Sequence, residues 1–171
     1  AYRLLPGHFV GRATADEREG LLEASRVLEG LSETYYNVGD FLKSFYATPS
    51  ALKMSARAGP SPELMRGYAN MCATLGIISL NGAADGYRRR ALDMEAHIDD
   101  LPARAWSRVS LSSHSVWVAE WDRAEQEITE ALAIYAQLGD WRRWGVAAWL
   151  WPQVAQSRGQ LERAAELWAE L

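Results

Sequence analysis

The chain has 171 residues, a formal net charge of −4 and one cysteine. A single cysteine excludes an internal disulfide, and an acidic chain lacks the dense basic face that bulk nucleic-acid binding requires. The sequence holds neither a run of 18 uncharged apolar residues nor a signal-peptide pattern, so we expect no membrane span and a cytoplasmic location.

The chain predicts an all-α protein, because helix-period apolar patterns alternate with turn signals and no sustained period-2 alternation occurs. Residues 1–14 include Pro6-Gly7, which breaks a helix, and we interpret them as the remnant of an upstream element or a cap. First helices are expected at about 15–37, 61–78, 102–118 and 141–158. Second helices are expected at about 41–57, 82–98, 121–137 and 160–171.

These helices group into a repeat domain over 15–171, with repeats at about 15–57, 61–98, 102–137 and 141–171. The sequence starts at Ala1 rather than at a methionine, and it stops at Leu171 inside an apolar helical pattern. We therefore interpret it as a piece of a longer polypeptide.

Small residues recur at a stride of 40 in the second helices: Ser44, Ala84, Ala124 and Ala164. Seven positions after each of them stand Ala51, Ala91, Ala131 and Leu171. Two residues seven apart lie on one helix face, where small side chains let a neighbouring helix approach closely. Thirteen positions ahead of each stand the apolar residues Leu31, Met71, Leu111 and Trp151. The pattern predicts stacked helix pairs.

Several helix ends carry capping signals. Thr14 with Glu17 forms a capping box before the first helix. Further starts are indicated by Ser61-Pro62, Asp100 with Pro102, and Asp140. Turns between paired helices are expected at Gly39-Asp40, Asn81-Gly82, Ala119-Glu120 and Gly159-Gln160. Pro152 lies inside a predicted helix and should kink it.

The spacing Leu31-Ser32-x2-Tyr35 … Gly39-Asp40 … Ser44 … Ala51 resembles the tetratricopeptide (TPR) motif. The resemblance implies a right-handed α-solenoid of about four TPR-like helix–turn–helix repeats. The period departs from the family, since it is 40 residues rather than the usual 34 or so. That longer period leaves HEAT-like helix pairs as an alternative fold.

Four strings carry a narrower resemblance: 58–64 (AGPSPEL), 68–71 (YANM), 121–125 (WDRAE) and 138–145 (LGDWRRWG). They are similar to the TPR-like C-terminal region of large bacterial signalling proteins that carry an adenylate or guanylate cyclase domain and an AAA/STAND-type ATPase domain. The resemblance covers about 20–171. It implies that the cyclase and the nucleotide site lie outside this chain, so no catalytic residue is carried onto its positions.

Residues suited to catalysis or metal binding form no motif. A P-loop is absent, and the three histidines lack the His-x3-His spacing of zinc sites. Ser113 and His114 are adjacent on a predicted helix and point apart, so they cannot readily form a nucleophile–base pair. We predict no enzyme, cofactor or metal site. Cys72 is expected to be buried, and Arg88-Arg89-Arg90 to form a solvated face.

Three of the eight tryptophans, Trp106, Trp117 and Trp149, fall where TPR first helices usually face the concave groove. Aromatic residues are favoured at binding hot spots, but we expect these three mainly to pack against neighbouring repeats and keep the groove as the alternative. The candidate groove residues are Arg26, Glu33, Tyr36, Asn37, Arg66, Trp106, Val109, Ser113, Trp117, Trp149, Gln153 and Gln156. The first half of this face is polar and the second half is apolar and aromatic.

The leading hypothesis is a protein–protein interaction and regulatory scaffold module of a larger bacterial signalling protein. It would bind a peptide, a partner helix or another domain of its parent chain, because a solenoid presents an extended concave surface. The alternatives are the small-molecule sensor arm of a STAND-type regulator, with a closed pocket near the groove tryptophans, and an all-α enzyme. Neither nucleic acid nor a membrane is expected as a partner. Since solenoids need capping repeats, we also expect a homo-oligomer through the exposed 160–171 helix.

Overall fold

The computed structural model of the chain describes residues 10–171. Residues 1–9 of the predicted N-terminal segment (1–14) therefore lie outside the described residues. The described part is helical and contains no strand. Its helices are α1 (Ala15–Asn37), α2 (Phe41–Ala58), α3 (Pro62–Ile77), α4 (Asn81–Glu95), α5 (Leu101–Trp117), α6 (Trp121–Leu138), α7 (Trp141–Ala148), α8 (Leu150–Ser157) and α9 (Leu161–Glu170). Among residues 10–171, none of these helices is long and apolar enough for a membrane crossing.

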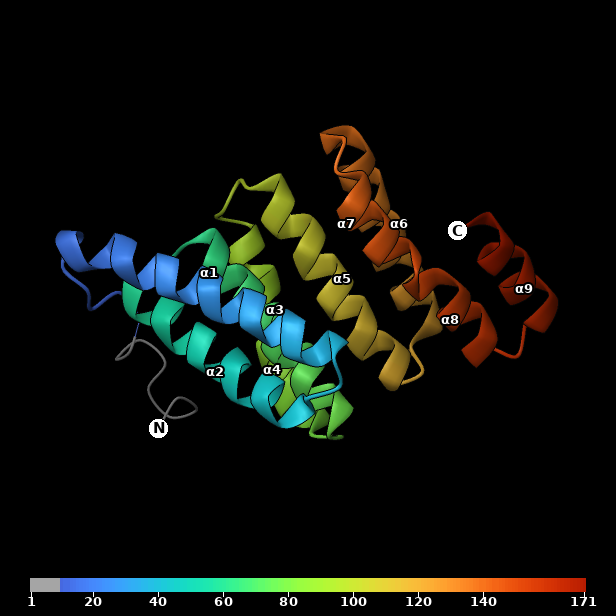
Figure 1. Cartoon of the computed structure of the whole chain (residues 1–171), viewed down its shortest axis with the longest axis horizontal. Helices are drawn as coiled ribbons and strands as arrows, with labels where there is room; N and C mark the ends of the chain where they lie inside the picture. The colour runs from blue at the N-terminus through green and yellow to red at the C-terminus, as the bar shows by residue number, and fades with distance from the viewer. Residues whose placement is uncertain (1–9) are drawn as a thin grey trace.

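Successive helices pack as neighbouring pairs along the molecule: α1 with α2, α3 with α4, α5 with α6, and α8 with α9 (Figure 1). One apolar cluster joins α2, α3 and α4 to Leu111 of α5, and a second joins α5 to α6, α7 and α8. Helix α5 belongs to both clusters. It therefore ties the N-terminal pairs to the C-terminal ones.

The small residues at the stride of 40 are buried, as predicted. Ser44, Ala84, Ala124 and Ala164 are between 0% and 5% exposed. Ala51, Ala91 and Ala131 are buried as well. Leu171 breaks the pattern because α9 ends one residue earlier and packs mainly against α8, which leaves Leu171 54% exposed.

The capping signals hold in the structure. The Thr14 side chain accepts a hydrogen bond from the Glu17 backbone N–H, and the Glu17 carboxylate accepts one from the Thr14 backbone N–H, which completes the predicted capping box. Ser61, Asp100 and Asp140 each accept a hydrogen bond from the backbone N–H three residues later. The predicted starts of α3, α5 and α7 are therefore confirmed.

The four turns that join first to second helices have one shared geometry. Gly39, Ser79, Ala119 and Gly159, again 40 residues apart, adopt left-handed φ angles of 78°, 59°, 61° and 79°. In each turn, the backbone N–H of this residue donates to the carbonyl three residues earlier, and the next N–H donates to the carbonyl five residues earlier. At Ser79, for example, the Ser79 N–H donates to the Gly76 carbonyl and the Leu80 N–H to the Leu75 carbonyl, both at 2.9 Å. These are Schellman caps. The turn predicted at Asn81-Gly82 is wrong, because both residues lie in the first turn of α4 and Ser79 takes the left-handed position.

Replacing Ser79 or Ala119 by glycine should stabilise the protein. Both residues hold a Cβ atom in a left-handed conformation, which costs roughly 1 kcal/mol that glycine avoids, partly offset by the greater flexibility of glycine in the unfolded chain. We expect each variant to raise the free energy of unfolding by up to about 1 kcal/mol in urea titrations. The reverse change at the equivalent position, Gly159→Ala, should lower it.

The predicted kink at Pro152 is confirmed. The helical path from Trp141 to Ser157 breaks at Trp149, which separates α7 from α8. Pro152 has no N–H to donate to the carbonyl of Ala148, and its ring crowds that carbonyl. Beyond this break α8 runs at an angle to α7 (Figure 1). A second proline, Pro49, lies within α2 without interrupting its helical assignment.

The arginine run in α4 is only in part the solvated face that the sequence suggested, because Arg89 is exposed whereas Arg88 is buried. Arg88 is 6% exposed and donates hydrogen bonds to the Leu111 carbonyl (3.2 Å), Ser115 Oγ (3.1 Å) and the carboxylate of Glu127. Ser115 donates to the other carboxylate oxygen of Glu127 at 2.9 Å. The interpretation fails for Arg88 because a partner 39 positions later, on α6, neutralises the guanidinium inside the molecule.

His114 and Cys72 are both buried between the helix pairs. Cys72 is fully buried, as predicted, and its burial raises the pKa of the thiol to about 12. His114 is 1% exposed, and neither ring nitrogen has a hydrogen-bond partner. A Cβ atom built on Gly76 would lie 2.7 Å from His114 Cδ2, so only glycine lets α3 approach the ring this closely. Burial, followed by the nearby Arg88 cation, lowers the pKa of His114.

This burial should make stability depend on pH. Because the pKa of His114 is lower in the folded chain, the unfolded chain binds more protons as the pH falls below about 6.5. We expect the urea midpoint to be highest above that pH and to fall below it. His114→Leu should flatten this slope, since it removes the buried ring nitrogens while leaving His8 and His97 in place. An unchanged slope in His114→Leu would show that other groups cause it.

Candidate ligand-binding groove

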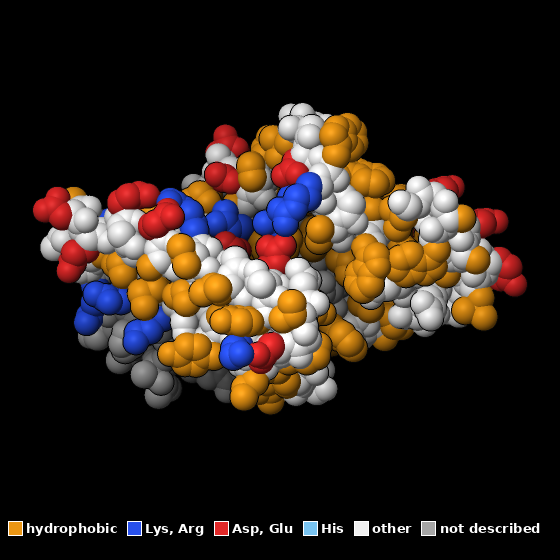
Figure 2. Space-filling view, viewed as in Figure 1, with side chains coloured by type: hydrophobic (Ala, Val, Ile, Leu, Met, Phe, Trp, Pro, Cys, Tyr) orange, Lys and Arg blue, Asp and Glu red, His pale blue; other side chains and the backbone are white. Residues whose placement is uncertain are grey.

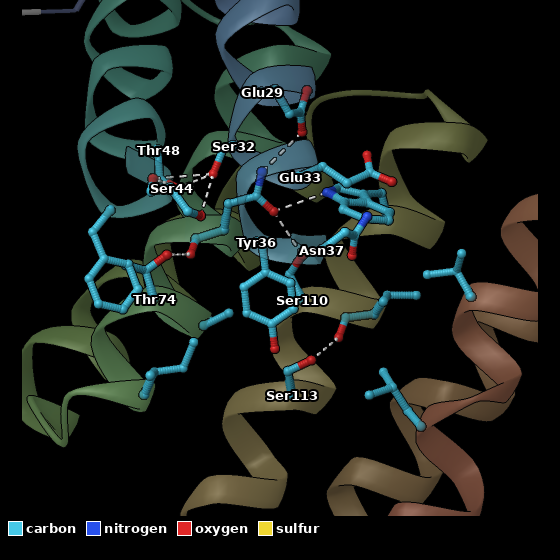
Figure 3. Close-up of a pocket in the computed structure, with 18 of the residues that line it drawn as sticks. Glu29, Ser32, Glu33, Tyr36, Asn37, Ser44, Thr48, Thr74, Ser110 and Ser113 are labelled. Carbon is cyan, nitrogen blue, oxygen red and sulfur yellow. Dashed lines mark hydrogen bonds between the residues drawn. The ribbon is translucent and has the colours of Figure 1, made fainter. Parts of the chain in front are cut away.

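The first helices of the pairs line one open groove, together with the N-terminal half of α2 (Figure 3). Its volume is about 270 Å³. Eight of the residues selected from the sequence line it: Glu33, Tyr36, Asn37, Trp106, Val109, Ser113, Trp117 and Trp149. They come from α1, α5 and the break between α7 and α8, so the structure brings together residues that are more than 100 positions apart.

Two of the other selected residues, Arg26 and Arg66, line a neighbouring polar recess of about 300 Å³. This recess shares Glu29, Glu33 and Trp106 with the groove. Charged side chains of both signs gather there, between α1 and α7 (Figure 2).

Gln153 and Gln156 line neither space, among the residues that the structure describes. Gln153 donates a hydrogen bond to the carbonyl of Trp149 at 3.3 Å, and Gln156 is exposed. The selection placed both on the groove face by analogy with the other first helices. Both glutamines lie on α8, beyond the break at Trp149.

Asn70, which the sequence-based selection omitted, organises the polar side of the groove. Its amide nitrogen donates to Glu29 at 3.0 Å, and its carbonyl oxygen accepts from Trp106 Nε1 at 3.0 Å and from Ser110 at 2.8 Å (Figure 3). Arg66 Nε donates to Glu29 at 3.0 Å. This network joins α1, α3 and α5, and it holds the Trp106 ring in one orientation.

The repeat stride could have found several of the omitted residues. Subtracting 40 from Ser113 and Trp117 gives Ala73 and Ile77, and both line the groove. Adding 40 to Trp106 gives Val146, which lines it too. The groove is thus periodic, like the buried seam. Ser44, Phe45 and Thr48 of α2 gave no such signal, because the second helices were assigned to the core.

Arg143 of α7 reaches across to the first helix pair. Its guanidinium lies 4.4 Å from the centre of the Trp106 ring, and its Nη1 lies 3.4 Å from a Glu33 carboxylate oxygen on α1. A cation over an indole face is attracted by the ring quadrupole. These contacts connect the first and last pairs at the boundary between the groove and the polar recess.

The opposite side of the groove is aromatic and accessible. Tyr36, Trp117 and Trp149 are 48%, 61% and 54% exposed. Trp149 packs edge-to-face with Trp168 of α9, with ring centroids 6.0 Å apart. Trp117 and Trp149 are therefore not buried between repeats, contrary to the packing interpretation, and the three rings provide apolar area for a ligand.

No group of three or more His, Cys, Asp or Glu side chains within residues 10–171 is placed to hold a metal ion. The polar groove side chains hydrogen-bond mainly to one another. Ser113 donates to the Val109 carbonyl at 3.1 Å, while the neighbouring His114 ring is buried on another side of α5. When compared with models of known families, with curated proteins and with solved structures, the chain matches none of them.

Proposed function

We propose that the chain is a right-handed α-solenoid of four TPR-like repeats whose groove binds a peptide or a partner helix. The stride of 40 in the buried small residues and in the Schellman turns supports the repeat assignment. The observation that carries the function is the groove itself, with Tyr36, Trp117 and Trp149 partly exposed around it. In this proposal the chain is a regulatory scaffold module of a larger bacterial signalling protein, as its resemblance implies.

The openness of the groove, more than its volume, favours a peptide over an enclosed small molecule. Pockets that enclose drug-sized ligands hold roughly 300–1,000 Å³ and bury most of the ligand. This groove holds about 270 Å³ and is open along one side. It can therefore take a few side chains from a longer segment, whose remaining length lies outside.

Selection from a random-peptide display library tests this function. Selected peptides should lose at least tenfold in affinity for the Trp117→Ser/Trp149→Ser double variant, because both apolar surfaces are removed. Trp141→Ser is the matched control, since Trp141 is 66% exposed and lies outside the groove lining. Equal losses in the control would contradict the assignment. Failure to select any peptide, together with quenching of tryptophan fluorescence by an apolar small molecule, would favour the sensor function instead.

Self-association through α9 stays a prediction. Leu161 and Trp168 on this helix and Leu171 just after it are 62%, 40% and 54% exposed. Apolar surface of this kind favours contact with another apolar face. Sedimentation of the chain over a concentration series should show association that Trp168→Glu weakens, and a monomer at all concentrations would contradict it.

A further inference from the structure

The polar side chains of the groove are largely engaged with one another. Besides the Asn70 network, Ser32 Oγ lies 3.1 Å from Ser44 Oγ and 2.7 Å from Thr48 Oγ1. Thr74 Oγ1 donates to the backbone carbonyl of Asn70 at 2.8 Å. A ligand group that displaced one of these bonds would have to replace it or leave a partly buried partner unsatisfied. A strongly polar ligand side chain would therefore add little binding free energy in this groove.

The charged groups at the groove are paired as well. Glu29 accepts from Arg66, and Glu33 lies within 3.4 Å of Arg143. Among the described groove residues, no charged side chain lacks an opposite partner. A charged ligand side chain would lose hydration on entering and find no free countercharge, which is unfavourable.

The groups that remain available are uncharged. The side chains of Tyr36 and Asn37 both line the groove near the end of α1, and none of the hydrogen bonds among the described residues uses them. A phenol and a primary amide together offer the donors and acceptors that a peptide bond needs. Apolar surface comes from Ile77, Val146 and Leu150, together with the faces of Trp117 and Trp149.

We propose that the groove selects an uncharged peptide segment that places one large aromatic or branched aliphatic side chain against Trp117 and Trp149. The peptide bond beside that side chain faces Tyr36 and Asn37. This inference rests on the proposed function and specifies its ligand, because it excludes charged anchor residues that a generic groove would admit.

Four capped amino acids serve as probes: N-acetyltryptophanamide, N-acetylleucinamide, N-acetyllysinamide and N-acetylglutamic acid α-amide. Their binding to the full chain is measured by NMR titration of its indole N–H resonances. We expect the tryptophan and leucine amides to bind at least tenfold more tightly than the lysine and glutamate amides. Trp117→Ser should weaken the apolar amides by at least tenfold, Asn37→Ala should weaken them several-fold, and Trp141→Ser should leave them unchanged.

The outcomes separate the two levels of the proposal. If the charged amides bind as tightly as the apolar ones and still require Trp117, the preference for uncharged anchors is wrong while the groove function stands. If no amide binds up to its solubility limit, the inference about the anchor is also wrong. If display-selected peptides bind without needing Trp117 or Trp149, the groove function itself fails.

Discussion

Arg88→Ala should lower the free energy of unfolding by about 3–5 kcal/mol, because it leaves the buried carboxylate of Glu127 without its cation. Glu127 is 4% exposed, and Ser115 would be the remaining side chain that donates to it. Burial already raises the pKa of the Glu127 carboxyl, and Arg88 opposes this shift. The loss can be measured by urea unfolding at neutral pH.

The double variant Arg88→Met/Glu127→Met should recover most of this loss, since replacing both members of a buried pair by apolar residues is often neutral. The exposed pair of Arg123 and Glu120, 49% and 42% exposed at the side chains, is the matched control. Arg123→Ala should cost less than about 1 kcal/mol. If the double variant were as unstable as Arg88→Ala, the cost would come from lost packing or from the bonds to Leu111 and Ser115, and not from an unpaired charge.

Ala124→Leu should destabilise the protein by about 1–3 kcal/mol or more, because it forces extra volume into the buried seam of small residues. Ala124 is fully buried in the cluster that joins α5, α6 and α7. A leucine there must either push a neighbouring helix away or adopt a strained rotamer. Thermal and urea unfolding should both report the loss.

Ala133→Leu is the control for this change, because Ala133 lies on the exposed side of the same helix. The two substitutions have the same intrinsic effect on helix formation, so their difference isolates packing. We expect Ala133→Leu to change the free energy of unfolding by no more than about 0.5 kcal/mol. Equal effects at both positions would mean that Ala124 does not mark a close helix contact.

Much of the helix layout could be predicted because it depends on local or periodic features. A capping box needs only Thr14 and Glu17, and a close helix contact needs a small residue such as Ala84 at every repeat. The burial of Arg88 could not be predicted in this way, since it depends on Glu127 on a helix that is distant in sequence. Likewise, Ser79 accepts a left-handed φ because the repeated packing requires a turn there, against the preference of its own side chain.

The residues that line the groove could be predicted where the repeat is regular, but not where a helix break interrupts it. Trp106, Trp117 and Trp149 line the groove, as analogy with TPR first helices suggested. Gln153 and Gln156 do not line it, and both lie on α8, beyond the interruption of the fourth first helix at Trp149. The role of Asn70 lies in hydrogen bonds to Glu29, Trp106 and Ser110 on two other helices, and only the three-dimensional arrangement reveals it.

The most direct test of the central claim is an NMR map of the eight tryptophan indoles while a display-selected peptide is added to the intact chain. Binding in the groove predicts that the Trp117 and Trp149 resonances shift most and that Trp141, on the outer part of α7, does not respond. Saturable peptide binding that moves Trp141 and leaves Trp117 and Trp149 unchanged would place the partner elsewhere and contradict the account.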